Sequence, residues 1–252
     1  MTGPFDRAKE VYSERGAREL LSRIVDQLSY QCSERTFGSR TWFRIRAFVN
    51  SIRYDTIYEP YEIEYVDPAD VQYRSARAQR TDRSRWKDVG RVLGGDWDIK
   101  SKSPEYAIEN ELLYHAIEDH FERDVPWEKT EYVEKSLERL RQGGHEDTWR
   151  AVVQSEEDLW ERCEQLDELY DRIQTDGYKS KREVFDSQSA DPMGYYPRTF
   201  KYMLDEVMID RGRGGEPLLV DGKHRLFIAK VCGVEEIPVL VVVRHRKYVD
   251  HE

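Results

Sequence analysis

The segment from Leu218 to His245, LLVDGKHRLFIAKVCGVEEIPVLVVVRH, limits the fold of this chain more than any other. An apolar run stops at Asp-Gly-Lys-His-Arg, a short helical pattern follows, and a second apolar, β-branched run begins at Ile237. Gly233 is suited to end the helix, and the run from Ile237 to Val243 is typical of a strand buried on both faces. The segment therefore predicts a strand, a sharp turn, a short helix and a central strand of a sheet.

The rest of the chain supplies further strands and several helices. Apolar and acidic residues alternate over 61–66, and two short strand patterns, 206–209 and 217–220, flank the Gly-rich turn RGRGG and predict a hairpin. Helical periodicity covers residues 16–30, 108–121 and 159–173, with a weaker pattern over 132–140.

These elements predict an α+β fold. We expect a helical N-terminal segment over residues 1–59 and a main domain over residues 60–252. The domain is built on a small mixed sheet, and a helical insertion occupies residues from about 100 to 165.

Composition narrows the class of protein. The formal net charge of −10 argues against generic nucleic-acid binding, and an acidic chain with 28 Arg against 12 Lys fits a halophilic cytoplasm. Cys32, Cys163 and Cys232 form no zinc or disulfide pattern. The N-terminus lacks the apolar core of a signal peptide, and no apolar run is long enough to cross a membrane, so we expect a cytoplasmic protein without a membrane partner.

The turn between Val220 and the short helix has the chemistry of a phosphate site. A helix that starts just after a strand presents free backbone N–H groups and a positive dipole end. Gly222 permits close approach of a ligand, and Lys223, His224 and Arg225 add donors to the same helix start. The residues also fit a purely structural turn, in which Asp221 caps the helix, Arg225 pairs with a carboxylate and His224 is half-buried.

The order DGKHR, LFIAKVCG, VEEIPVLVVV resembles the core motif of the ParB/sulfiredoxin superfamily. Two further stretches are similar to the same family: LDELYDRIQTDGYKSKREV, residues 166–184, resembles its helix and Gly turn, and EYVDPADV, residues 64–71, resembles its opening strand and turn. The resemblance implies a sheet of the ParB/sulfiredoxin type.

In that superfamily the matching turn binds nucleotide phosphates, of ATP in sulfiredoxins, CTP in ParB proteins, and ADP or ATP in archaeal free-serine kinases. The resemblance therefore implies that His224 and Arg225 bind phosphate. Lys223 stands where sulfiredoxins carry their catalytic Cys, so sulfiredoxin activity is not expected. A segregation ParB is not expected either, because the sequence up to Glu252 contains no helix-turn-helix domain after this motif.

The DGxHR form is most similar to the kinase-like members of the family. Asp221 is accordingly our candidate catalytic residue and metal ligand, either holding a Mg²⁺ that bridges phosphates or accepting a proton from a hydroxyl. Arg244, at the end of the last strand, is a further phosphate candidate. Asp96, Trp97 and Asp98 in the loop GGDWD form a secondary candidate site for Mg²⁺ or a stacked base, or a structural turn around Trp97.

The sequence thus predicts a nucleotide-phosphate-binding protein that uses ATP, ADP or CTP with Mg²⁺. Such a protein would act as a phosphotransferase or NTPase on an unknown acceptor. The alternative is a non-enzymatic regulatory or nucleic-acid-associated binding module with a protein partner.

Overall fold

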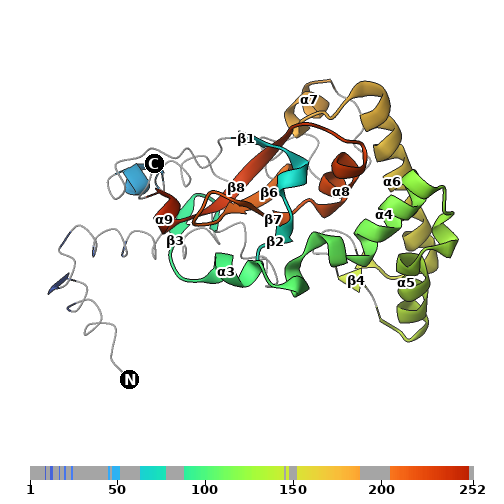
Figure 1. Cartoon of the computed structure of the whole chain (residues 1–252), viewed down its shortest axis with the longest axis horizontal. Helices are drawn as coiled ribbons and strands as arrows, with labels where there is room; N and C mark the ends of the chain where they lie inside the picture. Colours follow the sequence, from blue (N-terminus) through green and yellow to red (C-terminus); the bar gives the residue numbers. More distant parts are fainter. Residues whose placement is uncertain are drawn as a thin grey trace.

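A computed structural model describes residues 63–77, 88–144, 146–147, 152–187 and 205–249, together with separate positions between 9 and 51. Most of the predicted N-terminal segment lies outside the described residues, and of the helix expected over residues 16–30 only Ala17, Leu20 and Ile24 are described, each as helical. The described part is a mixed sheet with most of its helices, α4 to α8, gathered at one side of it (Figure 1).

The sheet is built around one long strand near the C-terminus. Its strands are β1 (Ile63–Val66), β2 (Tyr73–Arg74), β3 (Arg91–Leu93), β6 (Val207–Arg211), β7 (Pro217–Asp221) and β8 (Ile237–His245). Their order is β1-β8-β6-β7-β2, and β3 also pairs with β8. The pairs of β8 with β6 and β3 and of β2 with β7 are parallel, whereas β1 with β8 and β6 with β7 are antiparallel. The predicted α+β class with a mixed sheet is confirmed.

Helix α8 (Lys223–Val231) connects β7 to β8 and packs against α4 and α6. The remaining α-helices are α3 (Trp97–Ser101), α4 (Leu112–Arg123), α5 (Glu131–Arg141), α6 (Glu156–Asp176), α7 (Lys181–Asp186) and α9 (Arg246–Val249). Short 3₁₀ helices cover Pro68–Asp70, Pro104–Tyr106, Ile108–Asn110 and Trp127–Lys129, and β4 (Glu146–Asp147) pairs with β5 (Val152–Val153). A long run of helices, from α3 to α7, separates β3 from β6.

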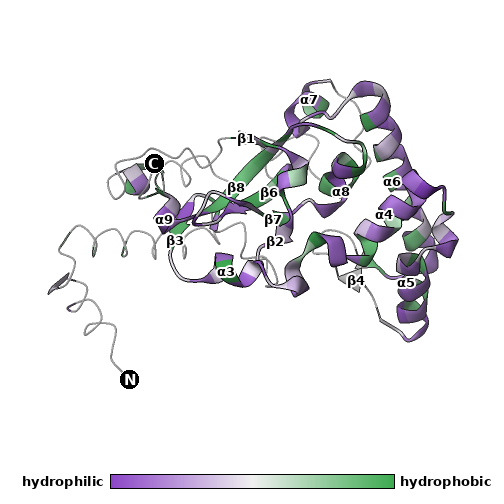
Figure 2. Ribbon diagram, in the orientation of Figure 1, coloured by the Kyte–Doolittle hydropathy of each residue, from purple (hydrophilic) through white to green (hydrophobic). Residues whose placement is uncertain are grey.

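The main core lies between the sheet and the helices. The central strands are the most hydrophobic part of the ribbon, whereas the outer helices are largely hydrophilic (Figure 2). Phe227 of α8 is fully buried there, and its ring centre lies 5.3 Å from that of Tyr114 on α4. This contact attaches α4 to the unit formed by β7 and α8.

A second, smaller apolar cluster lies on the other face of the sheet. It contains Met208, Leu240 and both Val242 and Val243, although consecutive strand residues normally face opposite sides. The pairing of β6 with β8 shifts register here, because Ile209 lies opposite Val241 and Asp210 lies opposite Val243. The shift marks a β-bulge that leaves Val242 without a partner in β6.

Asp210, at this bulge, is a fully buried carboxylate. It accepts hydrogen bonds from Ser75 Oγ at 2.6 Å and from the Val243 N–H at 3.1 Å, and its nearest ion-pair contact with Arg77 is 3.2 Å. Burial raises the pKa of Asp210, while Arg77 and the two hydrogen bonds oppose the rise. These contacts bind the segment after β2 to the middle of the sheet.

The sequence-based elements agree with the structure where they rest on long periodic runs. The expected helices over 108–121, 132–140 and 159–173 correspond to α4, α5 and α6, and the C-terminal strands and helix correspond to β6, β7, α8 and β8. Helix α7 and the short strands β2 and β3 were not expected from the sequence.

Candidate functional site

The turn after β7 is formed by a glycine that no other residue replaces without strain. Gly222 has φ 85°, in the left-handed region, and it occupies the N-cap position of α8. A Cβ on Gly222 would lie 2.9 Å from the Val207 Cα. Asp221 does not cap the helix with its side chain; its Oδ1 accepts a hydrogen bond from the Gly222 N–H at 2.8 Å.

The N-terminus of α8 has no side-chain cap. The amides of Lys223, His224 and Arg225 lie in the first turn, where an α-helix offers N–H groups without intrahelical acceptors. The half-buried side chains of Lys223 and His224 make no hydrogen bond or ion pair within the described residues. Burial lowers the pKa of His224 well below its usual value of 6.5, and the charges of Lys223 and Arg162 lower it further. The imidazole is therefore neutral at pH 7.

Arg225 points into the protein, where its guanidinium is already engaged. Its Nη2 donates to the Lys179 carbonyl at 2.5 Å, and its Nη1 lies 3.4 Å from Glu206 Oε2. The guanidinium carbon lies 4.6 Å from the centre of the Tyr178 ring. With only 7% of its surface exposed, Arg225 pairs with a carboxylate, as the structural interpretation of the turn requires.

Arg244 lies away from this turn. Met208 of β6 pairs with Asp221, and Arg211 at the other end of β6 pairs with Arg244, so three residues of strand, about 10 Å, separate the two positions. Arg244 is buried and donates to Glu64 Oε1 at 2.6 Å, while Arg211 donates to Glu64 Oε2, with its Nη2 at 2.6 Å. The structure thus separates Arg244 from the other phosphate candidates.

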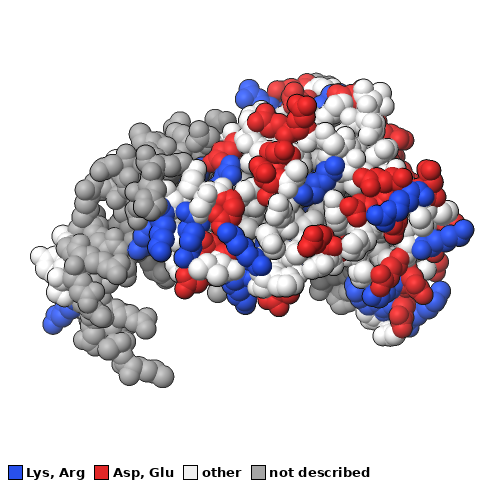
Figure 3. Space-filling model, in the orientation of Figure 1, with Lys and Arg blue, Asp and Glu red and all other residues white. Residues whose placement is uncertain are grey.

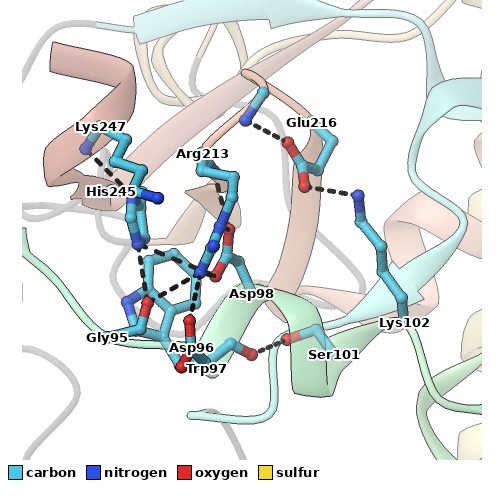
Figure 4. A network of polar contacts seen from close by, with 11 residues as sticks. Gly95, Asp96, Trp97, Asp98, Ser101, Lys102, Arg213, Glu216, His245 and Lys247 are labelled. Atoms are coloured by element: carbon cyan, nitrogen blue, oxygen red, sulfur yellow. Dashed lines mark hydrogen bonds and ion pairs between the residues drawn. The ribbon is translucent and has the colours of Figure 1, made fainter. Parts of the chain in front are cut away.

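The GGDWD loop also lies at this far end, beside the tip of the β6–β7 hairpin (Figure 4). Arg213 from the hairpin donates through Nε to Asp98 Oδ2 at 2.7 Å. Its Nη2 contacts Asp98 Oδ1 and Asp96 Oδ1, both at 2.8 Å, and the Gly95 carbonyl at 2.9 Å. The guanidinium therefore occupies the position between the two carboxylates that a Mg²⁺ would need.

Trp97 and His245 complete this network. Their ring centres lie 5.6 Å apart, and Figure 4 shows the indole beside the imidazole. His245 Nδ1 accepts from the Lys247 N–H at 3.0 Å, and Nε2 lies 2.9 Å from the Gly95 carbonyl. These partners assign the imidazole proton to Nε2. The loop is thus held by ordinary polar contacts on several sides.

Asp98 is the buried acid of this loop. Burial alone would raise its pKa, but hydrogen bonds from the Arg213 guanidinium and backbone N–H outweigh this effect and lower the pKa to about 2. Asp98 is thus a carboxylate under all physiological conditions.

Neither a ready-made metal centre nor a membrane span is found in the described ranges. Within them, no group of three or more His, Cys, Asp or Glu residues is placed to hold a metal ion. None of the described helices is both long and apolar enough to cross a bilayer. On the face shown in Figure 3, Lys and Arg are interspersed with Asp and Glu, so that face offers no continuous basic surface.

Sequence reasoning did not identify several residues that organise these two ends of the sheet. Glu206 and Lys179 bind Arg225, and Arg213 binds the acids of the GGDWD loop. Arg213 lies in the Gly-rich hairpin turn, and an arginine between two glycines was the one sequence feature that could have indicated its role. Glu206 had no signal, because a single acid before a strand is common in an acidic chain.

Comparison of the chain with protein-family models, with curated proteins and with solved structures gives no match.

We expect Gly222→Ala to destabilise the protein by about 2 to 3 kcal/mol, because alanine is strained at positive φ and its Cβ meets the Val207 backbone. Gly233→Ala is the matched control: Gly233 has φ 64° but nothing within 4 Å of the added Cβ, so we expect a loss of only about 1 kcal/mol. Urea unfolding measures both. Equal losses would contradict the close approach of Gly222 to β6.

The lowered pKa of Asp98 predicts acid sensitivity. The folded state gains stability from this carboxylate above its ordinary pKa of 3.8 and loses it as the pH falls from 3.8 towards 2. Over this window wild type should lose about 2 kcal/mol more than Asp98→Asn. Unfolding free energies at pH 5, 3 and 2 test this, with the exposed Asp96→Asn as control. Parallel pH profiles for Asp98→Asn and wild type would contradict it.

Proposed function

We propose that this protein binds a nucleotide through its phosphates at the N-terminus of α8, as a member of the ParB/sulfiredoxin superfamily. The observation that carries the proposal is the uncapped start of α8, where Gly222 replaces a capping side chain and the half-buried Lys223 and His224 have no polar partner within the described residues. An anion there accepts first-turn N–H groups and interacts favourably with the helix dipole.

The side chains at this helix start suit a phosphate chain better than a carboxylate ligand. Lys223 supplies a full positive charge with three donors, and neutral His224 supplies one N–H donor. Burial, and after it the charges of Lys223 and Arg162, keep the pKa of His224 low, and a bound phosphate would offset the repulsion from these two charges.

Asp221 is the acidic residue of the proposed site. It is half-buried and follows directly on β7, with one oxygen engaged by the Gly222 N–H. Mg²⁺ in nucleotide sites commonly binds one or two carboxylates, with phosphates and water supplying its other ligands. Asp221 would hold the metal in this manner, and the ion would offset the repulsion between its carboxylate and the phosphates. Phosphotransfer or nucleotide hydrolysis is the chemistry that this arrangement serves.

The first test of the proposed site is nucleotide-dependent stability in high KCl with Mg²⁺. ATP, ADP, CTP and GTP are added in turn, and the nucleotide that binds should raise the unfolding midpoint, since about 100 times its Kd contributes about 2.7 kcal/mol. Lys223→Ala should weaken binding about tenfold and reduce this shift. Lys247→Ala, an exposed lysine of α9 at the far end of β8, should retain the full shift.

Absence of a shift with every nucleotide would refute the proposed function. A shift that is equal in wild type and Lys223→Ala would place nucleotide binding elsewhere. Arg225→Ala is a poor reporter of binding, because it would leave the Glu206 carboxylate and the Lys179 carbonyl without their buried partner.

Turnover separates an enzyme from the alternative, a regulatory binding module. If Asp221 carries the chemistry, Asp221→Asn should abolish release of phosphate or nucleoside diphosphate while nucleotide still raises the unfolding midpoint, because asparagine keeps an acceptor for the Gly222 N–H. Undiminished turnover in the variant would exclude the catalytic role of Asp221. Wild type that binds nucleotide without turnover would instead favour the module.

A further inference from the structure

The ion pair of Arg225 with Glu206 is longer than several other arginine pairs of this sheet, although the contact of Arg77 with Asp210 is also long, at 3.2 Å. Arg225 Nη1 lies 3.4 Å from the carboxylate, whereas the contacts of Arg244 with Glu64 and of Arg213 with Asp98 are 2.6 and 2.7 Å. Charge-assisted hydrogen bonds between nitrogen and carboxylate are typically about 2.7 to 2.9 Å. The contact of Arg225 with Glu206 is thus longer than a typical charge-assisted hydrogen bond. The pair is also almost inaccessible to water, because only 8% of the Arg225 and 2% of the Glu206 side chain are exposed.

Glu206 has an anchor that does not depend on Arg225. Its Oε1 accepts a hydrogen bond from the Lys181 N–H at 2.5 Å, in the first turn of α7. The serine and glutamate of the capping box Ser180–Glu183 hold that turn in place. If Arg225 moves away, the Glu206 carboxylate keeps this bond and is not left without a partner.

A phosphate at the N-terminus of α8 would attract the guanidinium of Arg225. It belongs to the first turn of α8, the same turn that carries Lys223 and His224. A guanidinium fork binds two oxygens of one phosphate, and a phosphate group carries more negative charge than one carboxylate. The loose contact with Glu206 is the one most easily exchanged for such a ligand.

We propose that Glu206 is an internal competitor of the nucleotide phosphate for Arg225. This inference rests on the proposed function and adds a regulatory contact to the same site. Without ligand, Glu206 and the Lys179 carbonyl hold Arg225 inside the protein; with nucleotide, a phosphate oxygen replaces Glu206 on the guanidinium. The pair lowers the apparent affinity, because the binding-competent arrangement of Arg225 is only fractionally populated.

The test compares the Kd of wild type and Glu206→Gln for the nucleotide that gives the largest stability shift, measured by calorimetry at fixed KCl and Mg²⁺. Glutamine keeps an acceptor for the Lys181 N–H but removes the charge that holds Arg225, so we expect binding about 3 to 10 times tighter. A merely structural role of Glu206 predicts the opposite sign, since disturbing the site weakens binding. Near-UV circular dichroism verifies that the variant is folded.

Two further variants keep the result interpretable. Glu64→Gln removes the charge from an arginine pair at the other end of the sheet, and it should leave the Kd unchanged. If Glu206→Gln does not fold, Glu206→Asp withdraws the carboxylate from Arg225 by one methylene and keeps its charge, and it should also bind more tightly than wild type.

The outcomes separate this inference from the proposed function. Unchanged or weaker binding by folded Glu206 variants, with binding by wild type that depends on Lys223, overturns the competition and leaves the phosphate site standing. Tighter binding by Glu64→Gln as well would also overturn it, because the effect would then be general. No nucleotide binding by wild type or by any variant overturns both.

Discussion

The fold depends on β8, a strand that is buried at every position and hydrogen-bonded along both edges. One edge pairs with β6 between Val239 and Arg244, and the other is shared by β1, opposite Ile237 to Leu240, and β3, opposite Val243 to His245. Each buried N–H or C=O group of β8 that lacked a hydrogen bond would destabilise the folded state. The summed cost over the whole strand would exceed the contribution of any single side chain. The neighbours of β8 therefore fix where every candidate residue of the C-terminal region lies.

The two ends of this strand system carry different kinds of chemistry. At the end where β6 begins, Gly222 places the start of α8 against the Val207 backbone, and two donor side chains stay uncommitted among the described residues. At the other end, Arg211, Arg213 and Arg244 all bind carboxylates and join the hairpin and the GGDWD loop to the sheet. The anion site that we propose lies at the first end, and the ion pairs of the second end join parts of the fold.

The sequence predicts the strand-turn-helix-strand unit well, because each of its elements is signalled by neighbouring residues. An apolar run, a glycine and a helical stripe are local features, and the structure contains them close to the expected boundaries. The partners of the charged residues are not local. Asp98 and Arg213 are 115 residues apart, and Arg244 and Glu64 are 180 apart, so their pairing depends on the sheet order. For this reason Arg244 could be named as a candidate but not placed relative to the turn.

Arg225 illustrates the same limit within the turn itself. Its position beside His224 predicts that Arg225 binds phosphate. The side chain of an arginine is, however, long enough to extend either to the start of α8 or into the protein interior. The choice is set by Tyr178, Lys179 and Glu206, which arrive from the loop before α7 and from the start of β6. Nothing in the spacing of DGKHR reveals those neighbours.

The bulge between Val241 and Val243 makes β8 sensitive to the deletion of a single residue. Because Val242 adds one residue, Arg244 shares the face of Glu64 and Arg211, and His245 shares the face of Trp97. Deletion of Val242 would move the side chains of Arg244 and His245 to the opposite faces of the sheet. The extra residue at the bulge thus sets which face of the sheet each later side chain of β8 occupies. Both the pairing of Arg244 with Glu64 and the contact of His245 with the GGDWD loop depend on it.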